Sequence, residues 1–300
     1  MPPDPATGPA RLCVTNAKGG TGKTTVAINV AGALNERGHD VLFVDFDPQG
    51  NATEGLGLLE AYDAGPPSLF DVLTGGVGMD GASALVVAHP EMDVLPSNVD
   101  MLQAEHELTI ADLVSRAKRG VVDADPAAVA QLARNIDTGS VDQRHALDRL
   151  DRLLGEIEGD YDYVVIDSPP FYGQLTDTAI FAARNVIVPA LTEASSERAI
   201  ELLINQLAAL EEQADITVQT RGVVANRVET TNEDRTMLRW LNQVFDDFPV
   251  WEVRKRVALQ RAFSAGRSIF AYDEPVDVAD VFLELATDLD RQFGKQEMVA

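Results

Sequence analysis

The stretch Ala17-Lys18-Gly19-Gly20-Thr21-Gly22-Lys23-Thr24-Thr25 decides the fold of this chain. An apolar run, Leu12-Cys13-Val14, precedes it and predicts a short buried strand, and residues 26–34 continue with apolar side chains at helical spacing. Between a strand and a helix, glycines allow backbone N–H groups to converge on an anion, and the helix N-terminus adds a partial positive charge. The sequence therefore predicts a phosphate-binding loop rather than a plain glycine turn.

Two side chains of this loop suit a nucleoside triphosphate and its magnesium ion. Lys23 can reach the β- and γ-phosphates. The hydroxyl of Thr24, the next residue, is a suitable Mg²⁺ ligand. Mg²⁺ is therefore the expected metal cofactor.

Aspartates follow two further apolar runs that predict buried strands. Val41-Leu42-Phe43-Val44 ends in Asp45, with Asp47 two residues further on, and Tyr163-Val164-Val165-Ile166 ends in Asp167. Open α/β sheets bind their ligands just beyond the carboxyl ends of such strands. After a phosphate loop, a strand that ends in aspartate has the Walker B arrangement, so Asp167 is predicted to hold Mg²⁺ through water.

Strands alternate with helical patterns along the chain, which predicts an α/β fold: a three-layer P-loop NTPase with a mostly parallel twisted sheet flanked by helices. No linker divides the chain, so residues 11–300 are predicted to form a single domain after a disordered tail at residues 1–10. This proline-rich tail lacks the apolar segment of a secretory signal. No run of about 18 apolar residues occurs, so no integral membrane segment is expected.

The composition is unusually acidic for a nucleotide-binding protein. The formal net charge is −24, and the acidic residues are spread along the chain. This pattern favours a surface adapted to very high salt, as in a halophile, where self-repulsion is screened; an acidic surface for binding a partner is the alternative. The one cysteine, Cys13, excludes an internal disulfide and a cysteine-ligated cluster within one chain, and its place in a strand favours a buried apolar role.

The phosphate loop departs from the standard pattern in two ways that indicate a family. Ala17 stands where the standard loop has glycine, and Lys18 adds a second lysine at the loop entrance. The stretch resembles the xKGGxxK(S/T) loop of the ParA/MinD ATPases, with every fixed position present. The resemblance implies a homodimer with ATP sandwiched between the subunits, in which Lys18 reaches the nucleotide of the other subunit. The nucleotide-binding residues that it implies are Lys18, Gly19, Gly20, Thr21, Gly22, Lys23, Thr24 and Thr25.

Residues 45–53, DFDPQGNAT, resemble the first switch of the same family, DxDPQxNxT. The resemblance implies that Asp47 orients the attacking water and that Asp45 supports the Mg²⁺ shell. Without the phosphate loop, this segment would be read as an ordinary turn at a strand end. Ser168-Pro169-Pro170 resembles the second switch. The implied catalytic residues are Lys18, Lys23 and Asp47, and the implied metal-site residues are Thr24, Asp45 and Asp167.

Asn226 and Arg227, at the end of another apolar run, resemble a pair that lies against the base in this family. The next residues, Val228 and Glu229, do not fit the guanine-reading pattern NKxD, because Arg and Glu have the wrong size for it. Adenine, and hence ATP, is the expected nucleotide.

Two segments are harder to interpret. Residues 109–143 are longer than the family needs and are predicted to be an insertion with one or two surface helices, either a partner site or, as we favour, a solvated excursion.

Residues 252–268 are the exception to the acidic composition and resemble the basic segment that partition ATPases use to contact the DNA backbone. Pairing of these cations with the surplus carboxylates, or covering of the core by their stems, is the alternative. The predicted DNA-binding residues are Arg254, Lys255, Arg256, Arg261 and Arg267.

Taken together, the resemblance implies a cytoplasmic partition ATPase of the ParA/Soj type, nucleoid-associated when ATP is bound. Such a protein binds DNA non-specifically, positions a chromosome, plasmid or other cargo, and hydrolyses ATP slowly until a ParB-like or cargo adaptor stimulates it. A MinD-like, membrane-associated regulator of cell division is the alternative. That branch ends in a basic amphipathic helix, whereas residues 288–300 are acidic and mixed.

Overall fold

The sheet has seven strands in the part of the chain that the computed structural model describes, residues 8–136, 139, 141, 147–170, 172–272 and 276–295. Their order is β3-β2-β4-β1-β5-β6-β7, and every neighbouring pair is parallel. Most strands are apolar runs buried on both faces, as expected of a parallel sheet covered by helices. The strands are β1 (Ala10–Val14), β2 (Val41–Asp45), β3 (Asp93–Leu95), β4 (Tyr163–Asp167), β5 (Asn185–Leu191), β6 (Gln219–Val228) and β7 (Val250–Arg254).

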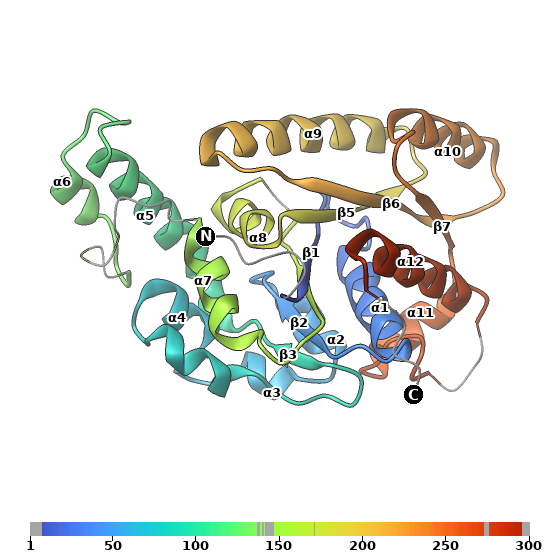
Figure 1. Ribbon diagram of the computed structural model, residues 1–300, viewed down its shortest axis with the longest axis horizontal. Coiled ribbons are helices and arrows are strands. Elements are labelled where there is room, and N and C mark those ends of the chain that lie inside the picture. The colour runs from blue at the N-terminus through green and yellow to red at the C-terminus, as the bar shows by residue number, and fades with distance from the viewer. Residues whose placement is uncertain are drawn as a thin grey trace.

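Helices cover both faces of this sheet, which confirms the predicted three-layer α/β architecture (Figure 1). The core on one face is closed by α1 (Lys23–Glu36), α11 (Val257–Ser264) and α12 (Val278–Phe293). The core on the other face is closed by α4 (Leu69–Thr74), α5 (Ala104–Lys118), α7 (Asp148–Ile157), α8 (Gln174–Ala183), α9 (Ser195–Ala214) and α10 (Asn232–Val244). The remaining short helices are α2 (Asn51–Gly55), α3 (Leu59–Tyr62), α6 (Pro126–Ala130), η1 (Met79–Leu85) and η2 (Val99–Gln103).

The strand order reverses at β1, which lies between β4 and β5. The chain runs from β1 to β2 on one side of this point and later returns to β5 on the other. Ligands of open α/β sheets bind at such a switch point, outside the carboxyl ends of the strands. Val14 of β1 pairs in register with Asp167 of β4, and Asp167 pairs with Asp45 of β2. The phosphate loop and both aspartates therefore lie at the same edge of the sheet, the carboxyl ends of the strands.

The structure corrects two boundaries of the sequence analysis. Residues 109–118 do not start an insertion: they continue α5, and Ile110, Ala111 and Val114 are buried in the core. The excursion proper therefore runs over residues 119–141, where α6 is the only helix in the part that the structure describes, and residues 137–138, 140 and 142–143 of the predicted insertion lie outside it. Ala10, placed in the predicted tail, is the buried first residue of β1; residues 1–7 lie outside the described residues.

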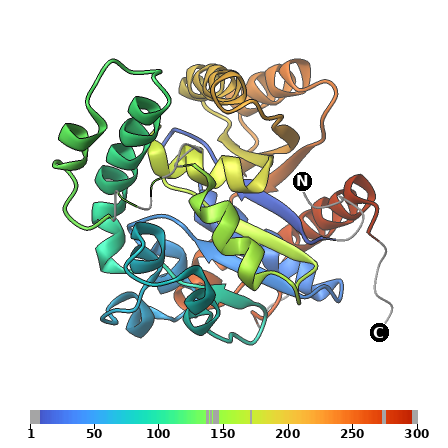
Figure 2. The same ribbon diagram turned by 60° about the vertical axis from the view of Figure 1, so that its left-hand side comes forward.

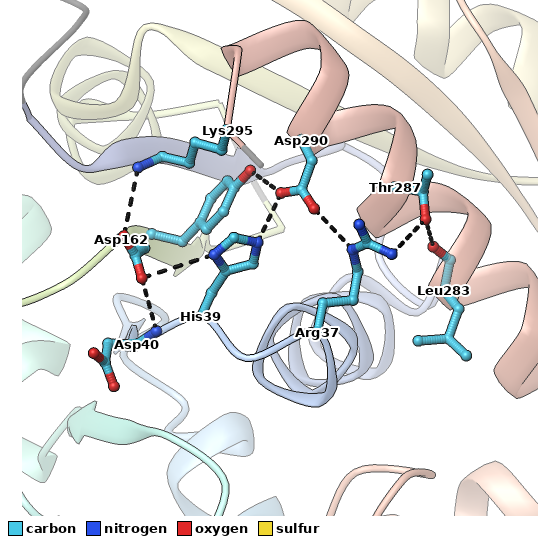
Figure 3. Close-up of polar contacts among 9 residues, drawn as sticks. Arg37, His39, Asp40, Asp162, Leu283, Thr287, Asp290 and Lys295 are labelled. Atoms are coloured by element: carbon cyan, nitrogen blue, oxygen red, sulfur yellow. Dashed lines mark hydrogen bonds and ion pairs between the residues drawn. The ribbon is translucent and has the colours of Figure 1, made fainter. Parts of the chain in front are cut away.

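Helix α12 packs into the core through an apolar stripe, in which Phe282 and Leu289 are fully buried. A polar cluster at its C-terminal end ties it to the turn between α1 and β2 (Figure 3). Asp290 accepts hydrogen bonds from the Tyr163 hydroxyl (2.6 Å) and Arg37 Nε (2.8 Å), and His39 Nε2 lies 2.9 Å from it. Burial alone would raise the pKa of Asp290, but these three partners hold it below its ordinary value.

We expect Asp290→Ala to lower the free energy of unfolding by about 3 kcal/mol, because it removes the acceptor shared by the buried Tyr163 hydroxyl and the half-buried Arg37 Nε. Glu284→Ala, on the exposed face of the same helix, is the matched control and should change it by less than about 0.5 kcal/mol. Urea unfolding of the three proteins at neutral pH measures both values. Equal stability of the two variants would show that the cluster does not anchor α12.

Candidate functional site

The loop between β1 and α1 has the backbone shape that a phosphate requires. Gly20 and Gly22 have φ of 78° and 85°, in the left-handed region that favours glycine. A Cβ atom at Gly22 would lie 2.2 Å from Asn226 Nδ2, so a side chain is also excluded there for lack of space. Helix α1 then begins at Lys23 with no acidic residue in its first turn, which leaves its N-terminal amides available to an anion.

Two asparagines, one of which sequence reasoning missed, hold this loop in place. The side chain of Asn16 donates to the carbonyl of Pro189 on β5 (2.7 Å) and accepts from the backbone amide of Lys18 (3.0 Å). Asn226 Nδ2 donates to the carbonyl of Thr21 (2.8 Å). Both asparagines are buried, so the loop is fixed to β5 and β6 before any ligand binds.

Asp167 lies fully buried at the end of β4, and neither carboxylate oxygen has a hydrogen-bond partner among the described residues. Burial and the nearby Asp45 raise the pKa of Asp167 well above its ordinary value, against the opposing effects of Thr24 and Lys23. A buried carboxylate without partners is costly, and a cation or its bound water would satisfy it.

The described residues contain no group of three or more His, Cys, Asp or Glu side chains placed to hold a metal ion by themselves. Mg²⁺ commonly keeps several waters and binds through one or two protein oxygens together with substrate phosphates. The orphaned Asp167 carboxylate and the Thr24 hydroxyl fit that kind of site. These two residues would hold Mg²⁺ beside a bound triphosphate.

Asp45 has a different environment from Asp167. Its Oδ2 accepts from both the amide and the hydroxyl of Thr53 (2.7 Å each), and its Oδ1 accepts from the amide of Asp47 (3.2 Å). The Thr53 hydroxyl also accepts from the amide of Ser97, beyond β3. Burial raises the pKa of Asp45 to about 7. Asp45 therefore braces the turn that carries Asp47, and a part in the Mg²⁺ shell stays a prediction.

Asp47 and Lys23 face the same space beyond the strand ends. Asp47 accepts from the amide of Gln49 (3.0 Å) and lines the cavity over the phosphate loop. Burial raises the pKa of Asp47, while Lys23 counteracts this effect. Burial lowers the pKa of Lys23, with Asp167 and Asp47 opposing. A lysine among buried carboxylates is placed to neutralise phosphate charge.

Lys18 points away from its own loop. Its Nζ donates to Glu193 Oε2 (3.0 Å) and to Ser195 Oγ (2.6 Å), between β5 and the start of α9. The hydrogen bond from Lys18 lowers the pKa of Glu193. The Glu193 side chain is 58% exposed, and such surface ion pairs contribute little free energy, so Lys18 can exchange this partner for another anion.

A cavity of about 860 Å³ lies over the loop, and its wall brings together segments far apart in the sequence. Besides the loop and Asp47, it is lined by Asn226 and Arg227 at the end of β6 and by Arg254, Lys255 and Arg256 at the end of β7. The Asn226 amide is engaged with Thr21, and its Oδ1 accepts from the amide of Arg227 (2.9 Å), so its observed role is to shape the loop. Contact of this pair with a base stays a prediction.

The predicted DNA-binding residues fall into two groups in the structure, those that line the cavity and those that do not. Three of its cations lie at the mouth of the cavity, where Lys255 pairs with Glu229 (2.7 Å) and Arg256 with Asp277 (2.8 Å), as the pairing alternative predicts. Arg261 and Arg267 are exposed and do not line the cavity. Two of the five predicted residues therefore lie outside the cavity wall, and contact of any of them with DNA stays a prediction.

No helix in the described part of the chain is long and apolar enough to cross a membrane.

Comparison with known proteins agrees with this geometry. A family model described as an AAA domain matches residues 10–220. The chain is 29% identical over 282 residues to the sporulation initiation inhibitor protein Soj of Bacillus subtilis, covering 93% of this chain and 97% of that protein. It is also 29% identical over 293 residues to the chromosome partitioning protein ParA of Caulobacter vibrioides, covering 96% and 97%.

Solved structures of other proteins have the same fold as this chain. A McdA variant from Cyanothece in complex with ATP has a TM-score of 0.73 over 98% of this chain and 100% of its own, at 20% identity, which shows the fold alone. Cobyrinic acid a,c-diamide synthase from Mycobacterium smegmatis, with a bound ATP analogue and magnesium, has a TM-score of 0.71 at 28% identity, covering 97% of this chain and 98% of that one. Because the family model spans more than half of the sequence, this chain belongs to the AAA domain family, and it is similar over nearly its whole length to the ParA and Soj proteins.

Proposed function

We propose that this chain is an ATPase that dimerises around Mg²⁺–ATP, binds DNA without sequence preference, and positions a chromosome, plasmid or other cargo. Hydrolysis is slow in the isolated protein, and a ParB-like or cargo adaptor stimulates it. The protein acts in the cytoplasm and associates with the nucleoid when ATP is bound. The observation that carries the proposal is the pair of lysines in one loop, because Lys23 faces the buried carboxylates and Lys18 faces outward.

The residues around the loop divide the work of phosphoryl transfer, which depends on positioning and charge neutralisation. Lys23 and the amides of the loop hold the phosphates, and Thr24 with Asp167 holds Mg²⁺, which neutralises phosphate charge when bound. Asp47, braced through Asp45, holds the attacking water. Asn226 and Arg227 border the space left for the base.

Dimerisation follows from the position of Lys18. Its ammonium group is held by Glu193 at the rim of the cavity rather than over its own loop. A second subunit that brings a triphosphate to this rim offers a more highly charged partner than one exposed carboxylate. Lys18 would then exchange Glu193 for the partner's phosphates and couple ATP binding to assembly.

DNA binding is the boldest part of the proposal, since a chain of net charge −24 repels a polyanion. The cations at the cavity mouth, Arg254, Lys255 and Arg256, form a local exception. A dimer would present two such sets together, and avidity would offset the weakening of phosphate contacts by salt. In very high salt, to which the acidic surface would be an adaptation, single phosphate contacts are weakest and DNA binding depends most on this avidity.

The MinD-like alternative is not favoured. The Pyrococcus horikoshii MinD structure is 21% identical to this chain with a TM-score of 0.65, which supports the fold alone. Helix α12 turns its apolar stripe into the core rather than toward a membrane.

The affinity for Mg²⁺–ATP should fall as the pH is lowered through the raised pKa of Asp167. Burial and the nearby Asp45 raise the pKa of Asp167, whereas a bound Mg²⁺ would favour its ionised form, so protonation of this carboxyl competes with metal binding. The Mg²⁺-dependent part of ATP affinity, measured by calorimetry with and without the metal, should therefore rise with pH in the wild type. Asp167→Asn should show a smaller Mg²⁺ contribution with a weaker pH dependence, because only protonation of the ATP phosphates then remains; a pH dependence equal to that of the wild type would exclude Asp167 from the metal site.

Lys18→Ala should retain ATP binding but lose ATP-dependent dimerisation and hydrolysis, because the lost ammonium serves the partner's nucleotide. Light scattering with and without ATP, together with an ATP titration, separates the two effects. Glu193→Gln is the control, since it releases Lys18 from its resting partner and should leave dimerisation intact. If mixed dimers with a wild-type subunit show no defect at the partner's site, the role across the dimer is wrong.

The variant Arg254→Ala/Arg256→Ala should dimerise with ATP but lose sequence-independent duplex binding. Binding to random duplexes, measured with a non-hydrolysable ATP analogue at stepwise salt, should lose about 0.9 units of log–log salt slope for each phosphate contact removed. Arg198→Ala, an exposed cation on α9 outside the cavity wall, is the control and should bind as the wild type does. Equal binding by the double variant, or none by the wild type at any salt that keeps it folded, would contradict DNA binding through this surface.

A further inference from the structure

The segment of residues 168–173 connects the metal-site residue Asp167 to the start of α8. At one end, the Ser168 hydroxyl donates to the carbonyl of Val14 on β1 (3.0 Å). In the middle, Pro170 lines the nucleotide cavity. The segment ends at Gly173, which cannot cap α8 with a side chain of its own. Phe171 lies outside the described residues, and the position of Gly173 depends on what holds the first turn of α8.

A carboxylate from another helix holds that turn. Glu105, on α5, accepts from the amide of Gln174 through Oε1 (2.7 Å) and from the amide of Leu175 through Oε2 (2.9 Å). Each of these amides would otherwise lack a partner within the helix. The acidic residue of α8 itself, Asp177, is instead engaged with Gln206 of α9 (2.6 Å). A carboxylate at this position also benefits from the helix dipole.

Gly173 fits tightly against this carboxylate. A Cβ atom at Gly173 would lie 2.4 Å from Glu105 Oε1 and 2.9 Å from its Cδ. The backbone of Gly173 is fully extended, with φ of −178°, which any residue can adopt. Glycine is thus required here by Glu105 and not by the backbone.

We propose that Glu105 is a positioning residue for ATP hydrolysis, which anchors the far end of the segment that follows Asp167. Glu105 does not line the nucleotide cavity, so it acts through the amides of Gln174 and Leu175 at the start of α8. The proposal rests on the proposed ATPase function. It predicts that loss of the anchor slows the chemical step while ATP still binds to the loop formed by residues 17–25.

A second carboxylate of α5 supplies a matched control. Glu107 is buried and accepts from three successive amides, those of Arg134, Asn135 and Ile136, in the excursion. Residues two apart on a helix point to nearly opposite sides, so Glu107 anchors the excursion and Glu105 anchors α8. Figure 2 shows α5 between the excursion and the rest of the chain. Loss of Glu107 should destabilise the fold without acting on the segment after Asp167.

The experiment compares Glu105→Ala, Gly173→Ala, their double variant and Glu107→Ala. Glu105→Ala and Gly173→Ala should each lower kcat roughly tenfold and change KM for ATP by less than about twofold, per folded molecule. The double variant should be no slower than either single variant, because the methyl group added at position 173 no longer meets the carboxylate. Glu107→Ala should keep the wild-type kcat even where it lowers the free energy of unfolding. Gly173→Ala keeps the proposal testable if Glu105→Ala does not fold.

Hydrogen exchange at the amides of Gln174 and Leu175 without nucleotide tests the anchor separately from catalysis. We expect faster exchange in Glu105→Ala and Gly173→Ala, and wild-type exchange in Glu107→Ala. Unchanged exchange would overturn the anchor, and additive losses of kcat or a kcat equal to that of the wild type would overturn its catalytic role. A wild-type protein that hydrolyses no ATP would instead overturn the proposed function, whatever the exchange shows.

Discussion

Much of this structure depends on the cost of burying carboxylates at the ends of two parallel strands. Asp45 and Asp167 face each other in register, both without exposure to solvent, and Asp47 lies close by. Hydrogen bonds from Thr53 and Asp47 satisfy Asp45, whereas Asp167 has no such partner among the described residues. Lys23 is the cation that faces this charge. The site is therefore held ready for a cation and a polyphosphate, which relieve the repulsion when they bind together.

Polar contacts fasten the helices beside this charge, α1 near both of its ends and α8 at its start. Helix α1 starts at Lys23, where Asn16 and Asn226 fix the phosphate loop to neighbouring strands. Just beyond its C-terminal end, Arg37 and His39 contact Asp290 of α12. Helix α8 is fastened at its start by Glu105 in the same way. Each of these contacts pairs a buried or half-buried polar group with an element far away in the sequence. Each contact therefore also specifies which elements pack together.

Much of the site could be predicted because its signals are local. The loop, the strands before Asp45 and Asp167, and the alternation of strands and helices are each contained in short stretches. The partner of Lys18 could not be predicted, because Glu193 is 175 positions away and no local pattern distinguishes it. The start of the insertion was misplaced because Asp112 and Ser115 are buried on α5 and interrupt its apolar stripe. The basic residues 254–256 read as a separate surface in the sequence, and only the order β5-β6-β7 places them at the cavity mouth.

Because lysine is scarce in this chain, chemical modification of its lysines can report on ligand binding. Lys18 and Lys23 lie in the phosphate loop, Lys255 lies at the cavity mouth on Glu229, and Lys295 lies 3.8 Å from Asp162. Lys118 donates to the carbonyl of Val141. An amine-directed acylating reagent thus has five side-chain targets in 300 residues, and two of them, Lys23 and Lys255, line the nucleotide cavity. The extent of acylation at each lysine, read by mass spectrometry, would follow ligand binding without any introduced label.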